Sequence, residues 1–214
     1  MSPRILLVGR SSPLLSELAA AAAEAGFQVL TTTTEEGAVD SGAREGPRSL
    51  PWNPRSLVSS RAVVMKAAHG EGGFQAALVL ANPERHGQAI SETSSGLIED
   101  TIDDAVKGRL FMLKELFSHF EKRGGGSIAL VSLSSEATQA PVDAAASGAF
   151  ESIGDSLFLA SEGTGLSLRG YRFESGDAGE FARFVFEQIG SESRRGLGKW
   201  FRYTGKSRRL SLGL

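Results

Sequence analysis

The turn "GRSSP" follows the apolar run "RILLV" and precedes a helical pattern, which places it at a helix N-terminus. Backbone N–H groups at such a terminus have no partner inside the helix, so they attract anions. Gly9, Arg10, Ser11 and Ser12 offer N–H groups and hydroxyls for this purpose. The turn lacks the lysine of a phosphate-binding P-loop, so it predicts an anion contact of another kind.

Two further serines follow the buried run "SIALV". Ser132 and Ser134 are two residues apart, so both project from one face of a strand. A hydroxyl there can orient a substrate by hydrogen bonding, whereas a serine at the end of a buried strand can also be a polar cap. The sequence leaves both roles open.

The composition offers no other catalytic or metal-binding chemistry. Cysteine is absent, which excludes disulfides and thiol nucleophiles and agrees with a reducing cytoplasm. His69, His86 and His119 lack the spacing of a metal site, so we predict no metal. No arrangement of Ser, His and Asp with a supporting context is present.

We expect a single domain over residues 1–214, because this length suits one large α/β core. The apolar run before Gly9 is too short for the core of a signal peptide. No stretch approaches the roughly 18 apolar residues that span a bilayer. The expected protein is therefore cytoplasmic and has no membrane partner.

The overall charge of −2 conceals a basic C-terminal segment. Residues 193–214 contain arginines and lysines but no acid, with aromatic residues between them. We expect "KWFRY" and "RRLSLGL" to form a terminal β-hairpin with solvated charges. The alternative is a contact with nucleic acid or another polyanion, made by cations such as Arg208 and Arg209.

Short buried runs alternate with longer amphipathic segments, as in a parallel sheet with crossover helices. The expected strands are residues 4–9, 27–33, 76–81, 127–133 and 166–173. The expected helices are residues 13–25, 56–69, 98–122, 142–161 and 178–190. Segment 35–51 is rich in Gly, Pro and charge, which predicts a loop where a crossover helix would be expected. The predicted fold is thus α/β, a Rossmann-like doubly wound parallel sheet abbreviated after its second strand.

The order of these elements resembles the short-chain dehydrogenase/reductase (SDR) family over most of the chain. The run "EKRGGGSIALVSLSSEATQAPVDAAASGAFESIGDSL" is similar to the family's glycine turn, central strand ending in serines, and active-site helix. Upstream, "RILLVGRSSPLLSELAAAAAEAGFQVL" resembles the first βαβ unit, and "AALVLANPE" resembles the strand that ends in Asn-Asn-Ala-Gly. The resemblance implies a nicotinamide-binding Rossmann fold.

Most cofactor residues of the family are absent at the matching positions. The family's glycine fingerprint lets pyrophosphate approach a helix N-terminus. Gly9 matches the first glycine, but Pro13 and Leu15 replace the other two. Asn82 lies in the segment that flanks the cofactor, and Asn53 lies where an acid that contacts adenine is expected. The resemblance therefore predicts no nicotinamide cofactor in the usual pose.

The family's catalytic pair is absent as well. SDR enzymes reduce carbonyls with a tyrosine acid and a lysine four residues later. Those positions contain Ala144 and Gly148, while Ser132 or Ser134 matches the family's serine. Neither tyrosine of the chain is followed by a lysine at that spacing. The residues thus predict the loss of hydride transfer.

Two helices of the chain resemble those through which SDR proteins form a four-helix interface. Residues 98–122 are apolar on more than one face, which leaves apolar surface to bury. Residues 142–161 begin with the small residues "AAASG", which permit close approach of another backbone. We expect a homodimer with two-fold symmetry through these helices.

The opening of the chain also resembles a response-regulator receiver domain. A receiver requires acids after its first strand and an aspartate after its third, but this chain has "GRSS" and Asn82 there. At 214 residues the chain is also longer than that fold. We therefore follow the SDR resemblance.

The expected function is that of a catalytically inactive SDR-like protein, a binding or scaffolding module with a protein partner and no cofactor. The alternative is an NAD(P)-dependent short-chain oxidoreductase whose catalytic residues have moved. Binding of NADH or NADPH distinguishes the two hypotheses, because the second requires it.

Overall fold

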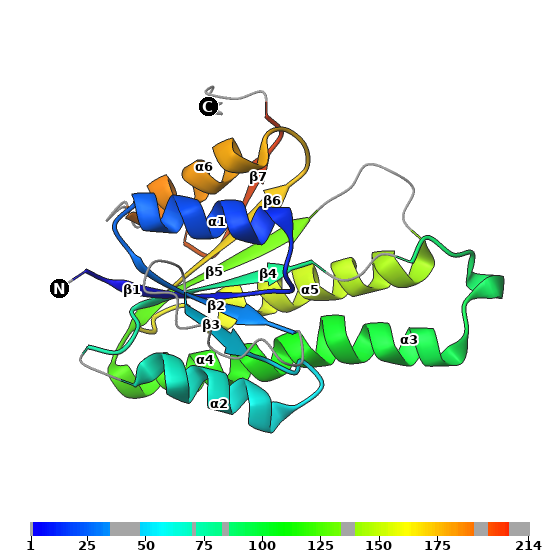
Figure 1. The fold of residues 1–214 in the computed structure, drawn as a ribbon, viewed down its shortest axis with the longest axis horizontal. Coiled ribbons are helices and arrows are strands. Elements are labelled where there is room, and N and C mark those ends of the chain that lie inside the picture. Colours follow the sequence, from blue (N-terminus) through cyan, green and yellow to red (C-terminus); the bar gives the residue numbers. More distant parts are fainter. Residues whose placement is uncertain are drawn as a thin grey trace.

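The computed structural model describes residues 2–34, 48–69, 72–82, 86–133, 140–190 and 197–205 (Figure 1). Strands and helices alternate along the chain, and the strands form one sheet between two layers of helices. This arrangement confirms the predicted α/β, Rossmann-like doubly wound fold.

The sheet contains seven parallel strands in the order β3-β2-β1-β4-β5-β6-β7. Their bounds are Arg4–Val8 (β1), Gln28–Thr33 (β2), Arg48–Pro51 (β3), Ala76–Ala81 (β4), Gly126–Leu133 (β5), Leu166–Phe173 (β6) and Trp200–Tyr203 (β7). The direction of chain progress reverses between β1 and β4. In open α/β sheets, ligands bind at such a switch point, beyond the carboxyl ends of the strands.

Helices cover both faces of the sheet (Figure 1). One face carries α1 (Pro13–Glu24) and α6 (Ala178–Gly190), which pack against each other. The other carries α2 (Leu57–Ala68), α3 (Ser95–Ile102), α4 (Gly108–Arg123) and α5 (Pro141–Ala160). A short 3-10 turn, Ile90–Glu92, precedes α3. None of the described helices combines the length and apolar character needed to cross a membrane.

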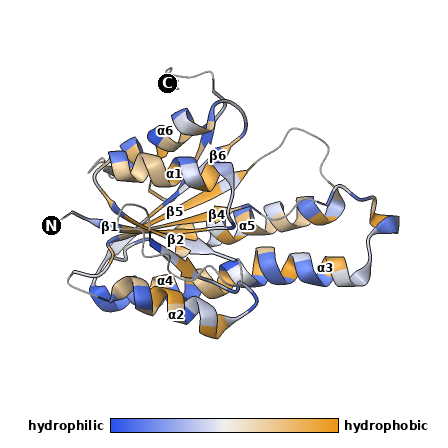
Figure 2. Cartoon of the chain, viewed as in Figure 1, coloured by the Kyte–Doolittle hydropathy of each residue, from blue (hydrophilic) through white to orange (hydrophobic). Residues whose placement is uncertain are grey.

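The core lies in two layers, because successive side chains of a strand point to opposite faces of the sheet. In β1, Leu6 and Val8 join the layer beneath α2, α4 and α5, while Ile5 and Leu7 join the layer beneath α1 and α6. All six residues of β4 are buried, as expected for a parallel strand covered on both sides. Figure 2 shows the central strands in the hydrophobic colours.

The loop predicted for residues 35–51 was wrong at its C-terminal end. Residues 48–51 form β3, which pairs in parallel with β2 from Arg48 opposite Leu30 onward. Of the four residues in this strand, Leu50 is the buried one. A single buried apolar residue forms no periodic pattern, so the sequence alone does not identify the strand. Pairing with β2, a contact distant in sequence, determines its conformation. Residues 35–47 lie outside the described residues.

The C-terminal region forms a strand as predicted, and the strand has an unexpected parallel partner. β7 pairs with β6, and the indole of Trp200 packs on two glycines. A Cβ atom on Gly154 would lie 2.5 Å from a Trp200 ring carbon, and one on Gly170 would lie 2.3 Å from another. The second arm of the predicted hairpin, residues 206–214, lies outside the described residues.

The helix predicted for residues 98–122 contains a π-helical turn, Asp103–Lys107, between α3 and α4. Such turns inside helices occur frequently at functional sites. Gly108 follows the turn, and a Cβ atom there would lie 2.7 Å from Cβ of Pro54. The loop after β3 therefore packs directly on the start of α4.

Most of the apolar stripe of α4 is buried within the chain. Its buried members are Met112, Leu113, Leu116 and Phe120. Leu110 is 45% exposed, and Ile102 in α3 is 38% exposed. These two side chains represent the second apolar face that the sequence predicts.

Candidate functional site

The turn from β1 to α1 meets the end of β4 at the switch point of the sheet. The Arg10 N–H donates to Asn82 Oδ1 at 3.1 Å, and Asn82 Nδ2 donates to the Arg10 carbonyl at 2.7 Å. Asn82 Nδ2 also lies within hydrogen-bond distance of Ser12 Oγ, at 3.2 Å. The amide of Asn82 thus binds the turn through both of its polar atoms.

Other N–H groups of this turn also have partners within the chain. The Gly9 N–H donates to Thr32 Oγ1 at 3.0 Å, and that hydroxyl donates to the Gly9 carbonyl at 2.9 Å. Ser12 is the N-cap of α1, and its Oγ accepts the Leu15 N–H at 3.2 Å. Pro13 has no N–H to offer. The Gly9 N–H, the Arg10 N–H and the Ser12 hydroxyl, three of the groups predicted to contact an anion, thus have partners inside the chain.

An ion-pair network covers this turn. Asp104, in the π-helical turn, lies 3.2 Å from Arg10 Nη1 and 2.8 Å from Arg55 Nε. Arg55 Nη1 lies 2.7 Å from Asp100 Oδ1. The π-helical turn thus brings one carboxylate between two arginines that are 45 residues apart in the sequence. A pocket of about 110 Å³ lies here, lined by Arg10, Arg55, His86, Leu97, Asp100, Thr101, Asp104 and Ala105.

A third arginine lies buried near this network. Arg109 is 2% exposed, and its guanidinium carbon lies 4.9 Å from the centre of the Trp52 ring. Nε and Nη1 of Arg109 have no hydrogen-bond partner among the described residues. Burial lowers the pKa of Arg109 to about 10, while the charge of Asp104 raises it. The group therefore stays positively charged at neutral pH.

Sequence analysis did not predict Arg109, although a signal for it exists. The residue lies four positions after the buried Ala105 and four before the buried Leu113 in the same helical stripe. An arginine inside an apolar stripe breaks the amphipathic pattern, because charged residues normally face solvent. This break in the apolar stripe is the sequence signal from which a buried cation could have been predicted.

Asn53 has a structural role at the start of α2. Its side-chain Oδ1 accepts the Arg55 N–H at 2.9 Å, and its own N–H donates to Ser59 Oγ at 2.9 Å. The residue is exposed, and its hydrogen bonds stabilise the turn that positions Arg55. Asn53 therefore lies beside the ion-pair network and stabilises the backbone that carries Arg55.

Ala144 and Gly148, at the positions of the family's tyrosine and lysine, are both exposed on α5. A Cβ atom added to Gly148 would meet no atom within 4 Å. The described chain therefore leaves room for a larger side chain at Gly148, whereas Ala146 of the same stretch is buried. The neighbouring Asp143 is 5% exposed, and its carboxylate accepts N–H groups of His86 at 3.2 Å and Gly87 at 3.4 Å.

Ser132, which is buried, begins a chain of polar contacts with the half-buried Glu151 and Arg172 that reaches across three elements. Its hydroxyl donates to Glu151 Oε1 in α5 at 2.9 Å, and Glu151 Oε2 lies 2.9 Å from Arg172 Nη2 in β6. The Arg172 guanidinium carbon lies 5.1 Å from the centre of the Trp200 ring. This arrangement ties β5, α5, β6 and β7 together. Ser134 lies outside the described residues.

Neither tyrosine reaches the α5 side of the sheet. Tyr171 is fully buried in the layer beneath α1 and α6, on the opposite face. Burial raises the pKa of Tyr171 to about 12, so its phenol stays neutral at physiological pH. The hydroxyl of Tyr203, in β7, lies 3.3 Å from Glu180 Oε2 in α6. Neither side chain can replace a tyrosine acid on α5.

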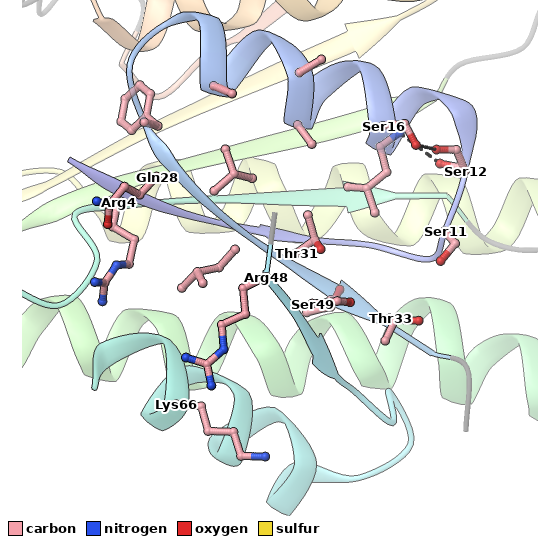
Figure 3. Close-up of a pocket in the computed structure, with 18 of the residues that line it drawn as sticks. Arg4, Ser11, Ser12, Ser16, Gln28, Thr31, Thr33, Arg48, Ser49 and Lys66 are labelled. Atoms are coloured by element: carbon pink, nitrogen blue, oxygen red, sulfur yellow. Dashed lines mark hydrogen bonds between the residues drawn. The ribbon is translucent and has the colours of Figure 1, made fainter. Parts of the chain in front are cut away.

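A separate groove of about 880 Å³ runs between α1 and β2 (Figure 3). Threonines of β2, serines of the turn and basic side chains line it, among them Thr31, Thr33, Ser11, Arg48 and Lys66. The groove borders the connection from β2 to β3, which lies outside the described residues, so we assign it no ligand. Among the described residues, no group of three His, Asp or Glu side chains could hold a metal ion.

Comparisons with known proteins identify the fold. No protein-family model matches the sequence, and no curated protein matches it. A protein from Burkholderia xenovorans described as a short-chain dehydrogenase/reductase superimposes with a TM-score of 0.78 at 15% identity, over 95% of each chain. A short-chain dehydrogenase from Streptomyces avermitilis gives a TM-score of 0.77 at 16% identity, over 94% of this chain and 88% of that one. The chain therefore has the fold of short-chain dehydrogenase/reductases.

Proposed function

We propose that this chain is a degenerate SDR-like protein that does not transfer hydride and acts as a binding or scaffolding module. The turn after β1 is the observation that carries the proposal. N–H groups of Gly9 and Arg10, which would face pyrophosphate in a dinucleotide-binding domain, bind Thr32 and Asn82 instead. The carboxylate of Asp104 next to Arg10 would in addition repel a phosphate there.

The residues present do not fit a nicotinamide dinucleotide in the pose usual for the fold. Pro13 and Leu15 replace two glycines that keep the approach to the helix open. The predicted contacts at Asn53 and Asn82 are directed to the backbone of this chain. We therefore propose that the protein uses no cofactor.

The positions of the catalytic pair support the same proposal. Ala144 and Gly148 offer no group that can donate or accept a proton, and neither tyrosine lies on that side of the sheet. General acid catalysis needs such a group within hydrogen-bond reach of the substrate. Ser132 donates to Glu151, which is ion-paired with Arg172, so this serine lacks the tyrosine and lysine that stand beside it in the family.

Calorimetric titration with NADH and NADPH tests the proposal. We expect dissociation constants weaker than about 1 mM, which corresponds to less than about 4 kcal/mol of binding free energy. Micromolar binding of either nucleotide, lost on Asn82→Ala, would contradict the proposal.

The alternative function is that of an NAD(P)-dependent oxidoreductase with relocated catalytic groups. The chain Ser132–Glu151–Arg172 favours it, because it places ionisable groups next to a serine at the end of β5. This alternative requires that the protein bind NADH or NADPH, and that Glu151→Gln lose the oxidoreductase turnover of the unmodified chain. If neither nucleotide binds, the alternative is excluded.

The exposed small residues of α5 support a scaffolding role. Ala144, Ala145 and Gly148 lie exposed on this helix, and Leu159 near its end is 73% exposed. Small side chains let another helix approach closely, and the exposed leucine adds apolar area. We propose that the protein is cytoplasmic and forms a homodimer through α4 and α5, with a further protein as partner.

A further inference from the structure

Residues 86–102 form an arm that lies outside both layers of the core. This segment, the α3 arm, contains the 3-10 turn Ile90–Glu92 and α3, and Figure 1 shows α3 extending beyond the sheet. Thr101 is the buried residue of the arm. None of the arm's residues, all of which the structure describes, belongs to either core layer. The arm therefore has the burial pattern of a segment that opens locally.

Ion pairs join the C-terminal end of the arm to the rest of the domain. Arg55, in the turn before α2, lies 2.7 Å from Asp100 Oδ1 and 2.8 Å from Asp104 Oδ1. Asp104 also lies 3.2 Å from Arg10 Nη1. In the described lining of the pocket of about 110 Å³, Arg10 and Arg55 face residues that all come from the arm and the π-helical turn. The pocket is therefore the seam between the arm and the rest of the domain.

The π-helical turn Asp103–Lys107 gives the arm a defined hinge. Such a turn contains more residues than an α-helical turn, and one residue of α-helix corresponds to a rotation of about 100°. If hydrogen bonding in the turn returned to the α-helical pattern, α3 would rotate relative to α4 and Asp104 would leave the two arginines. The start of α4 is held in place, because Gly108 packs on Pro54. The ion pairs thus favour one of two arrangements of the arm.

The N-terminal end of the arm has an attachment of a different kind. The buried carboxylate of Asp143, in α5, accepts the N–H groups of His86 at 3.2 Å and Gly87 at 3.4 Å. At the other end, the side chains of Arg55 and Asp100 are 45% and 58% exposed. Salt screens exposed charges far more strongly than buried ones. The two attachments should therefore respond differently to ionic strength.

We propose that the α3 arm is a salt-sensitive hinged segment, held closed by Arg55 on Asp100 and Asp104, which opens at the π-helical turn when the ionic strength rises. In the closed state Asp104 lies against Arg10 and so covers the β1–α1 turn. Opening widens the seam and exposes Ala105, which is buried in the closed state. The inference does not rest on the proposed function, because no nucleotide or partner takes part.

Labelling of a single thiol tests the inference, because the chain contains no cysteine of its own. Ala105→Cys places a thiol in the seam, where a neutral maleimide can reach it when the arm opens. Between about 0.1 M and 1 M sodium chloride, the Debye length falls from about 10 Å to about 3 Å. We expect the labelling rate to rise about fivefold over this range, because three exposed ion pairs are screened together.

A variant, a matched control and a reference thiol separate this opening from a general effect of salt. Arg55→Gln removes the ion pairs, so Ala105→Cys in that background should be labelled at the fast rate at both salt concentrations. Arg61→Gln is the matched control, because it breaks the exposed pair with Glu115, 3.2 Å away, which joins α2 to α4. It should leave the labelling at low salt slow. Ala67→Cys, at a fully buried position of α2, should be labelled slowly at both concentrations.

Each outcome supports or overturns the inference. Salt-dependent labelling of Ala105→Cys that becomes fast and independent of salt in Arg55→Gln supports it. A rate that is independent of salt in the Arg55 background, or equal acceleration by Arg61→Gln, overturns it. Equal labelling rates for Ala105→Cys and Ala67→Cys would indicate opening of the whole domain and would also overturn it. If Ala105→Cys does not fold, amide hydrogen exchange of residues 95–107 in the unmodified chain and in Arg55→Gln decides by the same criteria.

Discussion

Charged side chains buried in apolar surroundings are the unusual residues of this chain. Asp143, Arg109 and Arg169 are 5%, 2% and 6% exposed. The carboxylate of Asp143 accepts backbone N–H groups, and Arg169 Nη1 donates to the Gln188 carbonyl at 2.8 Å. Arg109 differs, because its Nε and Nη1 have no partner among the described residues.

We expect Arg109→Met to raise the free energy of unfolding by about 1–4 kcal/mol, because a buried, poorly paired charge is replaced by apolar contacts. Urea denaturation at pH 7 measures this change. Arg169→Met is the comparison, and it should lower the free energy of unfolding because a hydrogen-bonded cation is lost. A clear loss of stability in Arg109→Met would show that the guanidinium is already compensated.

Acid should weaken the fold through His119. Burial lowers the pKa of His119 below its ordinary value of 6.5, and its ring stacks on Phe74 at 4.4 Å. Below about pH 6.5 the unfolded chain therefore binds a proton that the folded chain resists, so stability falls as the pH drops. His119→Phe keeps the stacked ring and should reduce the loss of stability between pH 7 and pH 5.

Urea midpoints at a series of pH values measure this effect. His69→Gln, at an exposed histidine after α2, should leave the acid sensitivity unchanged. An identical pH profile for His119→Phe and the unmodified chain would contradict the assignment to His119.

At the scale of single residues, the sequence predicted where polar residues lie along the strands better than it predicted their hydrogen-bond partners. Ser132 and Asn82 were identified as polar residues at strand ends, and both do contact other polar groups there. Glu151 and Arg172, the partners of Ser132, lie 19 and 40 residues further along the chain. No local pattern relates such residues, because the fold alone brings them together.

Among the elements, α5 contains two glycines in very different surroundings. A Cβ atom on Gly154 would lie 2.5 Å from Trp200, whereas one on Gly148 would meet open space. We expect Gly154→Ala to cost about 1–3 kcal/mol by overpacking. Gly148→Ala should instead stabilise the helix by up to about 1 kcal/mol, since alanine is the better helix former.

Thermal denaturation of the two variants provides a matched comparison within one helix. Gly170→Ala in β6 should resemble Gly154→Ala, because its Cβ atom would meet other ring atoms of the same indole. If all three variants had equal stability, β7 would not be anchored by Trp200 as described.

The elements differ in how well the sequence predicted them, for a physical reason. The run "AALVLA" of β4 is buried on both faces, so its apolar character alone identifies a strand. β3 is short and edge-located, and its conformation depends on pairing with β2. The sequence did not predict the π-helical turn at Asp103–Lys107, because one extra residue in a turn barely changes the spacing of the apolar residues.

For the whole molecule, the predicted homodimer through α4 and α5 is open to a direct test. Ala145 is exposed on α5, so Ala145→Arg should leave the fold intact and disrupt a close helix contact. We expect light scattering to show a dimer for the unmodified chain at tens of micromolar, and a monomer for the variant.

The control is Ala20→Arg on the exposed side of α1, on the other face of the sheet. It should not change the mass in solution. A monomeric unmodified chain would remove the main support for a scaffolding role, since Leu110 and Leu159 would then lack a symmetric partner.

The two tryptophans of the chain lie at opposite edges of the sheet. Trp52 directly follows β3, the first strand in the sheet order, and Trp200 begins β7, the last. Each indole carries an arginine over its ring, so its emission responds to local loosening. With Trp52→Phe and Trp200→Phe, each edge can be observed separately during unfolding. Coincident midpoints would identify residues 1–214 as one cooperative unit, and separate midpoints would locate the edge that opens first.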